Sequence, residues 1–535
     1  MLKASGESGV RWMTDLLNAV IKKGNIPEDW SKSWMVSIYK GKGDALECNS
    51  YRGIKLLEHA MKVFERVIEA RLREKVDIDD MQFGFRAGKS TTDAIFIVRQ
   101  LQEKYLEKKR ELWMAFIDLE KAFDRVPREV IWWALRESGV EEWLISVIKS
   151  MYDGATTAVK IGASESKKFP VRVGVHQGSV LSPLLFIIVL EALSKKFRKG
   201  LPYELLYADD LVLIAESEEL LVEKIERWRK GLETGGLRVN FGKTKIMRCE
   251  IGAGQVKSSG KYPCGVCKKG VGRNSILCSM CKKWIHKKCS NIKGRLKPDP
   301  LYVCPACADV NRQEKNVEDK LQIKVKADVM LDCVENFCYL GDEIGARGGG
   351  AEEACRNRVK NAWMSFNKLG PILTTRGVSM RLKGKFYRMC VQRVMVYGSE
   401  TWPMRVEEIR RLERAERMMI RWMCGVTLKD RCKSEELRKR LDIEDVADVA
   451  RKSKLGWFGH LERKDEGDWV SACRNMVVPG NAGKGRPRKR WRDVVEDDLK
   501  KGRLDRSLAK DRDKWKAQIM GKTSDLCEHG KRDVK

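Results

Sequence analysis

Long apolar runs are missing from this sequence. The longest strongly apolar stretch, residues 184–190, is closed by Glu191 and falls far short of the roughly 20 apolar residues that a membrane-spanning helix needs. The first nine residues also lack the basic and then apolar pattern of a secretory signal peptide. We therefore expect an intracellular protein with no membrane partner.

Acidic residues are scarce relative to basic ones. The 535 residues include 75 Asp and Glu against 106 Lys and Arg, which gives a formal net charge of +31. The basic residues are spread along the chain, which implies a large polyanionic partner, with nucleic acid as the first candidate. The length predicts about two to four domains.

A phosphate-binding P-loop is also missing. Gly88-Lys89-Ser90-Thr91 resembles the end of that motif, but Phe83 stands where the motif requires glycine, and no strand precedes it. We expect Ser90 or Thr91 to be the N-cap of a helix that runs to about Lys108.

Three aspartates carry the first specific signal. Asp209 and Asp210 lie between two strand-like apolar segments, and Asp118 ends a further apolar strand that starts at Leu112. A capping role is an alternative for Asp118 alone. Together, three carboxylates would repel one another without a cation, whereas with two magnesium ions they form the clamp that in-line nucleotidyl transfer needs.

A glycine-containing segment lies between the two acidic sites. It contains Gln177-Gly178-Ser179 and is followed by a predicted apolar helix over residues 184–193. Glycine lets the backbone approach a ligand closely, and the amide and hydroxyl groups can bond to a sugar or a base edge. This segment is therefore a candidate substrate contact.

In this order, Asp118-x-x-x-Ala122-Phe123-Asp124, Gln177-Gly178-Ser179 and Tyr207-Ala208-Asp209-Asp210 resemble the reverse transcriptases of non-LTR (LINE-type) retrotransposons. Further stretches resemble the fingers motifs, the next palm motif, the hairpin that grips the primer and the C-terminal region of this family: residues 49–54, 82–86, 235–245, 336–341, 397–402, 421–426 and 456–463. Group II intron and telomerase polymerases share the chemistry, but the C-terminal stretches favour the LINE-type family. The resemblance implies an α/β right-hand polymerase with fingers, palm and thumb.

The resemblance also implies roles for individual residues. Asp118, Asp209 and Asp210 would hold two magnesium ions, and Lys243 would give a proton to the leaving pyrophosphate, with Lys245 as the alternative. The implied nucleotide- and template-binding residues are Lys40, Arg52, Arg86, Phe123, Gln177, Gly178 and Tyr207. Among them, Phe123 would lie under the sugar and exclude a 2'-hydroxyl. The implied partners are an RNA template, a DNA primer and deoxynucleoside triphosphates.

Seven of the 17 cysteines fall in one short block, which reads Cys264-x2-Cys267-x10-Cys278-x2-Cys281-x4-His286-x2-Cys289-x14-Cys304-x2-Cys307. Repeated Cys-x2-Cys steps with a histidine are typical of zinc sites, and a chain without an export signal favours metal ligation over disulfides. The spacing therefore predicts zinc binding.

The ligand order of this block resembles a PHD finger. That family interleaves its ligands, which implies one zinc on Cys264, Cys267, His286 and Cys289 and a second on Cys278, Cys281, Cys304 and Cys307. PHD fingers commonly bind histone H3 tails, so chromatin is one candidate partner. The lysines of the block favour nucleic acid over a basic tail, and both remain open.

The patterns divide the chain into fingers (1–110), palm (111–250), PHD-type finger (260–310), primer-grip-like hairpin (320–345), a helical thumb-like region (350–450) and a basic C-terminal region (451–535). In the last, the loop 483–492 would grip nucleic acid, with Trp491 stacking on a base, or serve as a nuclear address. We expect a nuclear protein with a cytoplasmic ribonucleoprotein stage.

Two functions follow from these patterns. The first is an RNA-directed DNA polymerase, and the second is a decayed or domesticated retroelement protein that binds nucleic acid or chromatin without turnover. An endonuclease usually precedes the polymerase in such elements, and this sequence starts almost directly in the fingers. We therefore expect a truncated or partly degraded element copy, or a gene model that begins late, and we do not expect this chain to nick target DNA. The oligomeric state is left open.

Overall fold

The structure is a computed structural model of the 535-residue chain. It describes residues 5–41, 43–200, 202–250, 264, 266–267, 271, 275–278, 283–290, 292, 302, 304–305, 322–326, 329–348, 351–481 and 488–521. The chain forms two compact units, one made of residues 1–250 and 323–535 and the other of residues 251–322. The predicted PHD-type finger therefore lies in a unit of its own.

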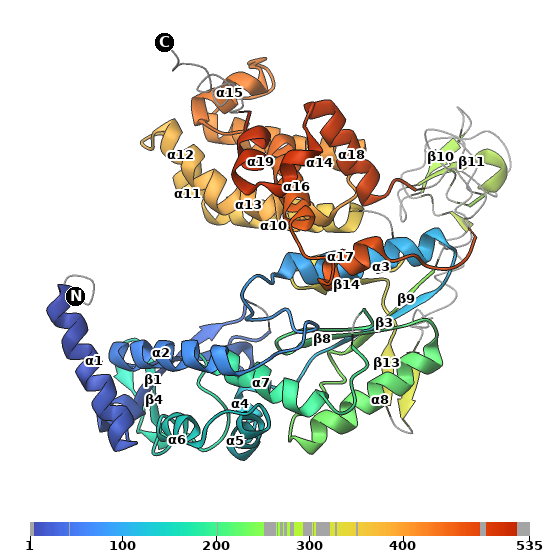
Figure 1. Cartoon of the computed structure of the whole chain (residues 1–535). Coiled ribbons are helices and arrows are strands. Elements are labelled where there is room, and N and C mark those ends of the chain that lie inside the picture. The colour runs from blue at the N-terminus through green and yellow to red at the C-terminus, as the bar shows by residue number, and fades with distance from the viewer. Residues whose placement is uncertain are drawn as a thin grey trace, which may run out of the picture. The chain divides into compact units, whose positions relative to one another are not determined.

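A four-stranded antiparallel sheet forms the centre of the larger unit. Its order is β7 (Glu204–Tyr207), β8 (Asp210–Ala215), β3 (Leu112–Ile117) and β9 (Lys245–Cys249). All six residues of β3 are buried, because the helix α3 (Thr91–Glu107) packs against this strand from one side and α8 (Glu218–Thr234) from the other (Figure 1). The strand that leads to Asp118 is thus held on both faces.

A second sheet combines strands that come before β3 in the sequence with strands that come after it. β1 (Lys32–Tyr39) pairs antiparallel with β2 (Tyr51–Leu56) and parallel with β4 (Thr156–Ile161), and two short strands, β5 (Ser164–Glu165) and β6 (Phe169–Pro170), pair with β4. Besides α3, the α-helices described up to residue 150 are α1 (Gly6–Lys23), α2 (His59–Lys75), α4 (Ala122–Arg125), α5 (Arg128–Glu137) and α6 (Glu142–Ser150).

Local sequence signals explain two of the buried helices. Ser90 caps α3, since its hydroxyl accepts from the Asp93 amide and the Asp93 carboxylate accepts from the Ser90 amide. The sequence left Ser90 and Thr91 open, and the structure selects Ser90. Helix α7 (Ser182–Ser194) has its proline in the first turn, where no hydrogen bond is lost, and is buried on nearly every face.

Two hairpins follow the inserted unit. They are β12 (Gln322–Lys326) with β13 (Val329–Asp332), and β14 (Asn336–Tyr339) with β15 (Asp342–Gly345). The second corresponds to the predicted primer-grip-like segment. In the inserted unit, β10 (Ser275–Leu277) pairs with β11 (Trp284–His286).

The remainder of the chain is helical. Its elements are α10 (Glu352–Lys368), α11 (Gly370–Leu373), α12 (Met380–Tyr387), α13 (Arg393–Val396), α14 (Val406–Cys424), α15 (Ser434–Leu441), α16 (Val446–Glu462), α17 (Trp469–Asn475), α18 (Trp491–Gly502) and α19 (Arg512–Ile519). A π-helical turn, Arg388–Gln392, connects α12 to α13. The helical character expected over 350–450 agrees with these elements.

Residues 351–450 form a core of their own, whereas the buried residues from Leu455 onward join the core of the central sheet and α3. Trp491 is one of them: it is 2% exposed, its ring meets Phe96 edge-on, and its Nε1 donates to the Glu400 carbonyl. The prediction that Trp491 stacks on a base is therefore wrong, because its ring is buried in the core.

None of the helices described by the structure combines the length and the apolar character that a bilayer span requires.

A buried ion pair ties the β14–β15 hairpin to α3. Arg99 Nη2 lies 2.8 Å from Asp342 Oδ2, the two side chains are 7% and 0% exposed, and Trp402 Nε1 donates to the same oxygen over 3.1 Å. The pair thus joins three segments that lie far apart in the sequence.

We predict that Asp342→Ala lowers the free energy of unfolding by about 3–5 kcal/mol, because it leaves the Arg99 guanidinium buried and unpaired. Urea denaturation measures this loss. Glu7→Ala removes an ion pair whose side chains are 82% and 93% exposed and should change stability by less than about 1 kcal/mol. Equal effects of the two substitutions would contradict the prediction.

Candidate active site

The three predicted aspartates meet at one edge of the central sheet. Asp118 directly follows β3, Asp209 lies in the turn between β7 and β8, and Asp210 begins β8. Because β3 and β8 are antiparallel with Ile117 opposite Leu211, the end of β3 lies beside the start of β8. Strand pairing therefore brings together acids that are far apart in the sequence.

The electrostatics of the site reflect this crowding. Burial, followed by the Asp118 charge, raises the pKa of Asp209, although Arg52 and Lys243 counteract the rise. The pKa of Asp210 is raised to about 6 by desolvation and then by Asp209 and Asp118. Asp210 still has exposed surface, so solvent screening moderates the repulsion that it feels.

Lys243 is the lysine that faces these carboxylates. Its Nζ lies 3.2 Å from Asp118 Oδ2, whereas Lys245 Nζ lies 2.8 Å from Asp332 Oδ2 on β13. The difference arises because the segment before Lys243 is bound to the end of β3: the Asn240 amide donates to the Asp118 carbonyl. The geometry thus separates two lysines between which the sequence could not choose.

The Gln177 segment docks on the β1–β2 sheet. The Lys55 amide donates to the Gln177 carbonyl over 2.7 Å, and Gln177 Nε2 donates to Asp124 Oδ1 over 2.8 Å. Gly178 has φ +107°, and a Cβ there would lie 2.6 Å from the Lys55 carbonyl oxygen. Glycine is therefore required both by its conformation and by the close approach.

Glu65 supports this segment, although no sequence pattern predicted this role. Its carboxylate is 2% exposed and accepts from Ser179 Oγ and the Val180 amide over 2.6 and 2.9 Å. Within the amphipathic pattern of α2 this glutamate resembled any other polar residue, so no local signal could have found it.

Two aromatic residues of the predicted site are half-buried. The Phe123 ring stacks on Phe186 of α7 with centroids 4.6 Å apart, which fixes its position after β3. Tyr207 is the last residue of β7 and lies opposite Asp210. Both side chains therefore come from the elements that carry the aspartates or pack on them.

The predicted basic residues of the fingers differ in their surroundings. Arg52 is exposed on β2, and its charge acts on Asp209. Lys40 Nζ donates to the Asn49 carbonyl over 2.8 Å, and Arg86 donates to the Asp79 carbonyl and to Asp80 Oδ1. The charge of Arg52 thus acts on the carboxylates, whereas Lys40 and Arg86 are engaged in their own loops. The binding roles of all three residues stay predictions.

The β14–β15 hairpin packs close to the same edge. Phe337 stacks on Phe116 of β3 with centroids 4.2 Å apart, and the Tyr339 ring lies 5.6 Å from Phe116. Burial, and then Asp210 and Tyr207, raise the pKa of Tyr339, whose hydroxyl has no hydrogen-bond partner in the part of the chain that the structure describes. This hairpin is therefore a near neighbour of the carboxylates.

The carboxylates fit magnesium by their chemistry. Three hard oxygen donors, two with raised pKa values, form a site whose charge a divalent cation would compensate. Among the described residues, the carboxylate oxygens of the three aspartates do not all lie within 4.8 Å of one another. In this arrangement the Lys243 ammonium pairs with Asp118 instead.

The inserted unit contains a cluster with the chemistry of a zinc site. The ligand atoms of Cys264, Cys267, His286 and Cys289 all lie within 4.8 Å of one another, in the interleaved set that the PHD resemblance implies. Of the second set, Cys278 Sγ accepts from the Cys304 amide over 3.3 Å, whereas Cys281 and Cys307 lie outside the described residues.

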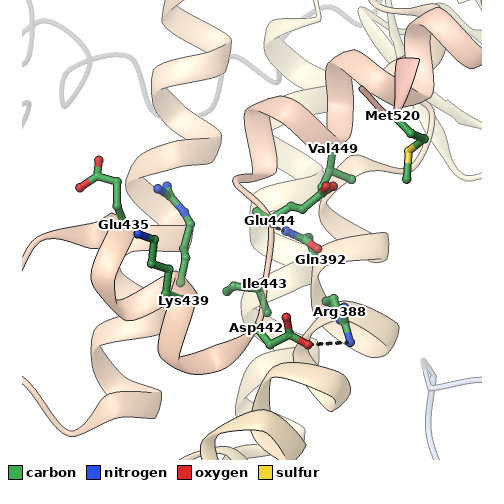
Figure 2. A pocket seen from close by; sticks show the side chains of 10 residues that line it. Arg388, Gln392, Glu435, Lys439, Asp442, Ile443, Glu444, Val449 and Met520 are labelled. Atoms are coloured by element: carbon green, nitrogen blue, oxygen red, sulfur yellow. Dashed lines mark hydrogen bonds and ion pairs between the residues drawn. The ribbon is translucent and has the colours of Figure 1, made fainter. Parts of the chain in front are cut away.

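A cavity of about 750 Å³ lies in the C-terminal helical region, far along the chain from the aspartates. Figure 2 shows Arg388 and Asp442 side by side in its wall, joined by an ion pair, with Glu435 and Lys439 projecting from α15. Basic and acidic side chains alternate around its wall, so it favours neither a cationic nor an anionic ligand.

Residues 38–289 match the family model described as reverse transcriptase (RNA-dependent DNA polymerase). This part of the chain is therefore similar to a reverse transcriptase domain. The matched residues include all three aspartates, the Gln177 segment and Lys243, and the match together with the relatives below supports the non-LTR type of reverse transcriptase and a polymerase fold.

Three relatives illustrate the similarity. The chain is 32% identical over 196 residues to a probable RNA-directed DNA polymerase from transposon X-element of Drosophila melanogaster, 27% over 232 residues to a Pol polyprotein from the retrotransposable element R2 of Nasonia vitripennis, and 26% over 257 residues to the RNA-directed DNA polymerase from mobile element jockey of Drosophila melanogaster. These alignments cover 35%, 42% and 44% of this chain and 21%, 22% and 27% of the relatives. The chain thus spans about a quarter or less of the length of these proteins.

A solved structure is similar over a wider range. Telomerase from Candida tropicalis in complex with a fragment of telomeric RNA aligns with a TM-score of 0.35 and 11% identity over 96% of this chain and 68% of that chain.

The raised pKa of Asp210 gives a pH-dependent prediction. An acid whose pKa is higher in the folded than in the unfolded state costs stability above the folded value, and this cost disappears below the unfolded value. We predict that Asp210→Asn raises the melting temperature in magnesium-free buffer at pH 8, with a gain that shrinks as the pH falls through about 6 towards 4.

Thermal melts at several pH values measure the effect. Asp77→Asn, at an exposed aspartate outside the site, should show no such pH-dependent gain. A gain for Asp210→Asn that is equal at pH 4 and pH 8 would contradict the electrostatic explanation.

Proposed function

We propose that this chain is an RNA-directed DNA polymerase that adds deoxynucleotides to a DNA primer on an RNA template. The observation that carries the proposal is the meeting of Asp118 with Asp209 and Asp210 at the end of β3, inside the residues that match the reverse transcriptase model. Paired strands with buried faces fix these acids at one edge of the sheet.

Asp118, Asp209 and Asp210 would hold magnesium. When bound there, the metal would lower the pKa of the primer 3'-hydroxyl and neutralise charge on the triphosphate. Lys243, which lies beside Asp118, would give a proton to the leaving pyrophosphate, and Arg52 would supply a guanidinium fork that suits phosphate oxygens.

The remaining residues of the proposal select the substrate. Phe123, fixed against Phe186, would lie under the sugar and exclude a 2'-hydroxyl. Gln177 and Gly178 would lie along the template and the incoming nucleotide, since their segment is held by Lys55, Asp124 and Glu65. Lys40 and Arg86 are kept as weaker contacts because each already has partners in its own loop.

A protein that binds nucleic acid without turnover is the competing function. The crowded carboxylates argue against it, because acids with raised pKa values weaken the fold at neutral pH. Natural proteins keep such a destabilising arrangement of charges mainly at functional sites.

Primer extension with poly-rA and oligo-dT tests the proposed activity. We predict that magnesium-dependent incorporation of dTTP falls by about a hundredfold or more in Asp209→Ala, the scale expected when an electrostatic stabiliser of the transition state is removed. Asp77→Asn should keep wild-type activity. Folded wild-type protein that binds this primer–template without extending it would favour the binding function.

For the inserted unit, we propose a zinc-bound PHD-type finger that binds nucleic acid. Trp284 is 40% exposed and lies opposite Leu277, which is 41% exposed, and Lys283 and Lys288 are exposed beside this pair. An aromatic ring flanked by lysines suits stacked bases and phosphates better than a basic peptide.

Binding by the zinc-loaded segment 251–322 tests this second proposal. We predict salt-sensitive binding of DNA and that replacing Lys283, Lys287 and Lys288 by glutamine lowers the slope of log K against log salt by about 0.9 for each lysine that contacts a phosphate. Histone H3 tail peptides should bind weakly. Micromolar H3 binding without salt-sensitive DNA binding would overturn the proposal.

A further inference from the structure

A short segment of the chain runs along the strand that leads to the catalytic turn. The Leu206 amide donates to the Met81 carbonyl and the Phe83 amide donates to the Leu206 carbonyl, each over 2.8 Å. Gln82 and Leu206 form a parallel bridge. Residues 81–84 thus extend the sheet beyond β7 and end beside Asp209.

Gln82 closes this contact with its side chain. It is 2% exposed, and its Oε1 accepts from the Gly84 amide over 2.8 Å and from the Ala208 amide over 3.0 Å. Because both partners are N–H donors, the atom that faces them must be the oxygen of the side-chain amide. One buried acceptor therefore holds two backbone donors in fixed positions.

The turn that Gln82 holds is strained. Ala208 has φ +56°, a left-handed conformation that costs a residue with a Cβ roughly 1–2 kcal/mol. Such a conformation persists only where the surrounding contacts impose it, and Ala208 is the residue directly before Asp209. The hydrogen bond to the Ala208 amide is thus one residue away from the carboxylate.

Gly84 makes the approach possible. A Cβ at this position would lie 2.5 Å from the Ala208 nitrogen, with no open space to receive it. Its φ lies outside the left-handed range, so the need for glycine comes from this contact and not from backbone strain.

The nitrogen of the Gln82 side-chain amide is further evidence that this residue does more than fill space. Its Nε2 is buried and has no hydrogen-bond partner among the residues that the structure describes. A buried unpaired donor lowers stability, so an apolar residue of similar size would be tolerated here if packing were the only requirement.

We propose that Gln82 and Gly84 are positioning residues for Asp209: the Gln82 oxygen and the bare Gly84 backbone set the conformation of the turn and so aim the carboxylate. The effect on catalysis rests on the proposed polymerase function. The effect on divalent-cation binding by the carboxylates does not require turnover, and it can be measured separately.

Gln82→Met keeps the length and volume of the side chain and removes the acceptor. We expect kcat for primer extension to fall by about 10- to 100-fold, the range that a displacement of about 1 Å at a reacting group produces. The KM for dTTP and the Kd for primer–template should change by less than about threefold, because neither ligand depends on Gln82 for its charge contacts. Gly84→Ala should act in the same direction.

Matched controls separate positioning from general destabilisation. Gln392→Met removes another buried glutamine, 4% exposed, whose amide donates to the Glu444 carbonyl in the separate core of residues 351–450. Gly370→Ala adds a Cβ where no atom lies within 4 Å. Both variants should keep the wild-type kcat, whatever their melting temperatures.

Thermal melts at increasing Mg²⁺, without nucleotides or nucleic acid, give the second readout. The Mg²⁺ concentration for half of the stabilisation should rise severalfold in Gln82→Met and Gly84→Ala, and stay unchanged in both controls. A Gln82→Met variant with wild-type kcat and a wild-type Mg²⁺ midpoint would overturn the proposal, as would an equal loss in Gln392→Met.

The two proposals fail in different ways. If the wild-type protein extends no primer, the polymerase function fails, and the Mg²⁺ midpoints still decide whether Gln82 positions Asp209. If wild-type protein is active and the Gln82 and Gly84 variants match it, only the positioning role fails.

Discussion

Repulsion among three carboxylates at the ends of paired strands is the constraint around which the larger unit is built. The antiparallel register of β3 with β8 leaves no alternative position for Asp118 and Asp210, since both strands are buried from end to end beyond these residues. The positive charges of Lys243 and Arg52 offset part of this repulsion. The packing of the surrounding elements holds the carboxylates in place against the remainder.

The packing is extensive where the charge is greatest. β3 lies between α3 and α8, and Phe116 of β3 stacks on Phe337 of the β14–β15 hairpin. Asp342 of that hairpin forms an ion pair with Arg99 of α3. Helix α3 thus supports both the strand and the hairpin that flank the carboxylates. A polymerase needs such rigidity, because a positioned group loses its effect when it moves by about 1 Å.

The sequence predicts most elements near the site, and its limits have physical causes. The strand before Asp118 and the Asp209 hairpin each have a clear apolar run with clear flanking residues. Glu65 and Gln82 act through partners more than 100 residues away, so no local pattern could assign their roles. Trp491 stood in a basic loop but is buried, because burial depends on the residues that pack on it from α3.

The zinc ligands of the inserted unit, in contrast to Glu65 and Gln82, can be predicted from a local sequence pattern. The spacing of the cysteines and the histidine predicts zinc binding, and the four ligands that meet in the structure are the set that the PHD resemblance implied. For the aspartates, the identity of the cation follows from charge and oxygen chemistry alone, so the most direct test is to count the ions that they bind. Titration with Mn²⁺, followed by electron paramagnetic resonance, should detect divalent ions on the wild-type protein that are lost in Asp118→Asn and Asp209→Asn. Equal Mn²⁺ binding by the wild-type protein and both variants would contradict the assignment of these carboxylates as a metal site.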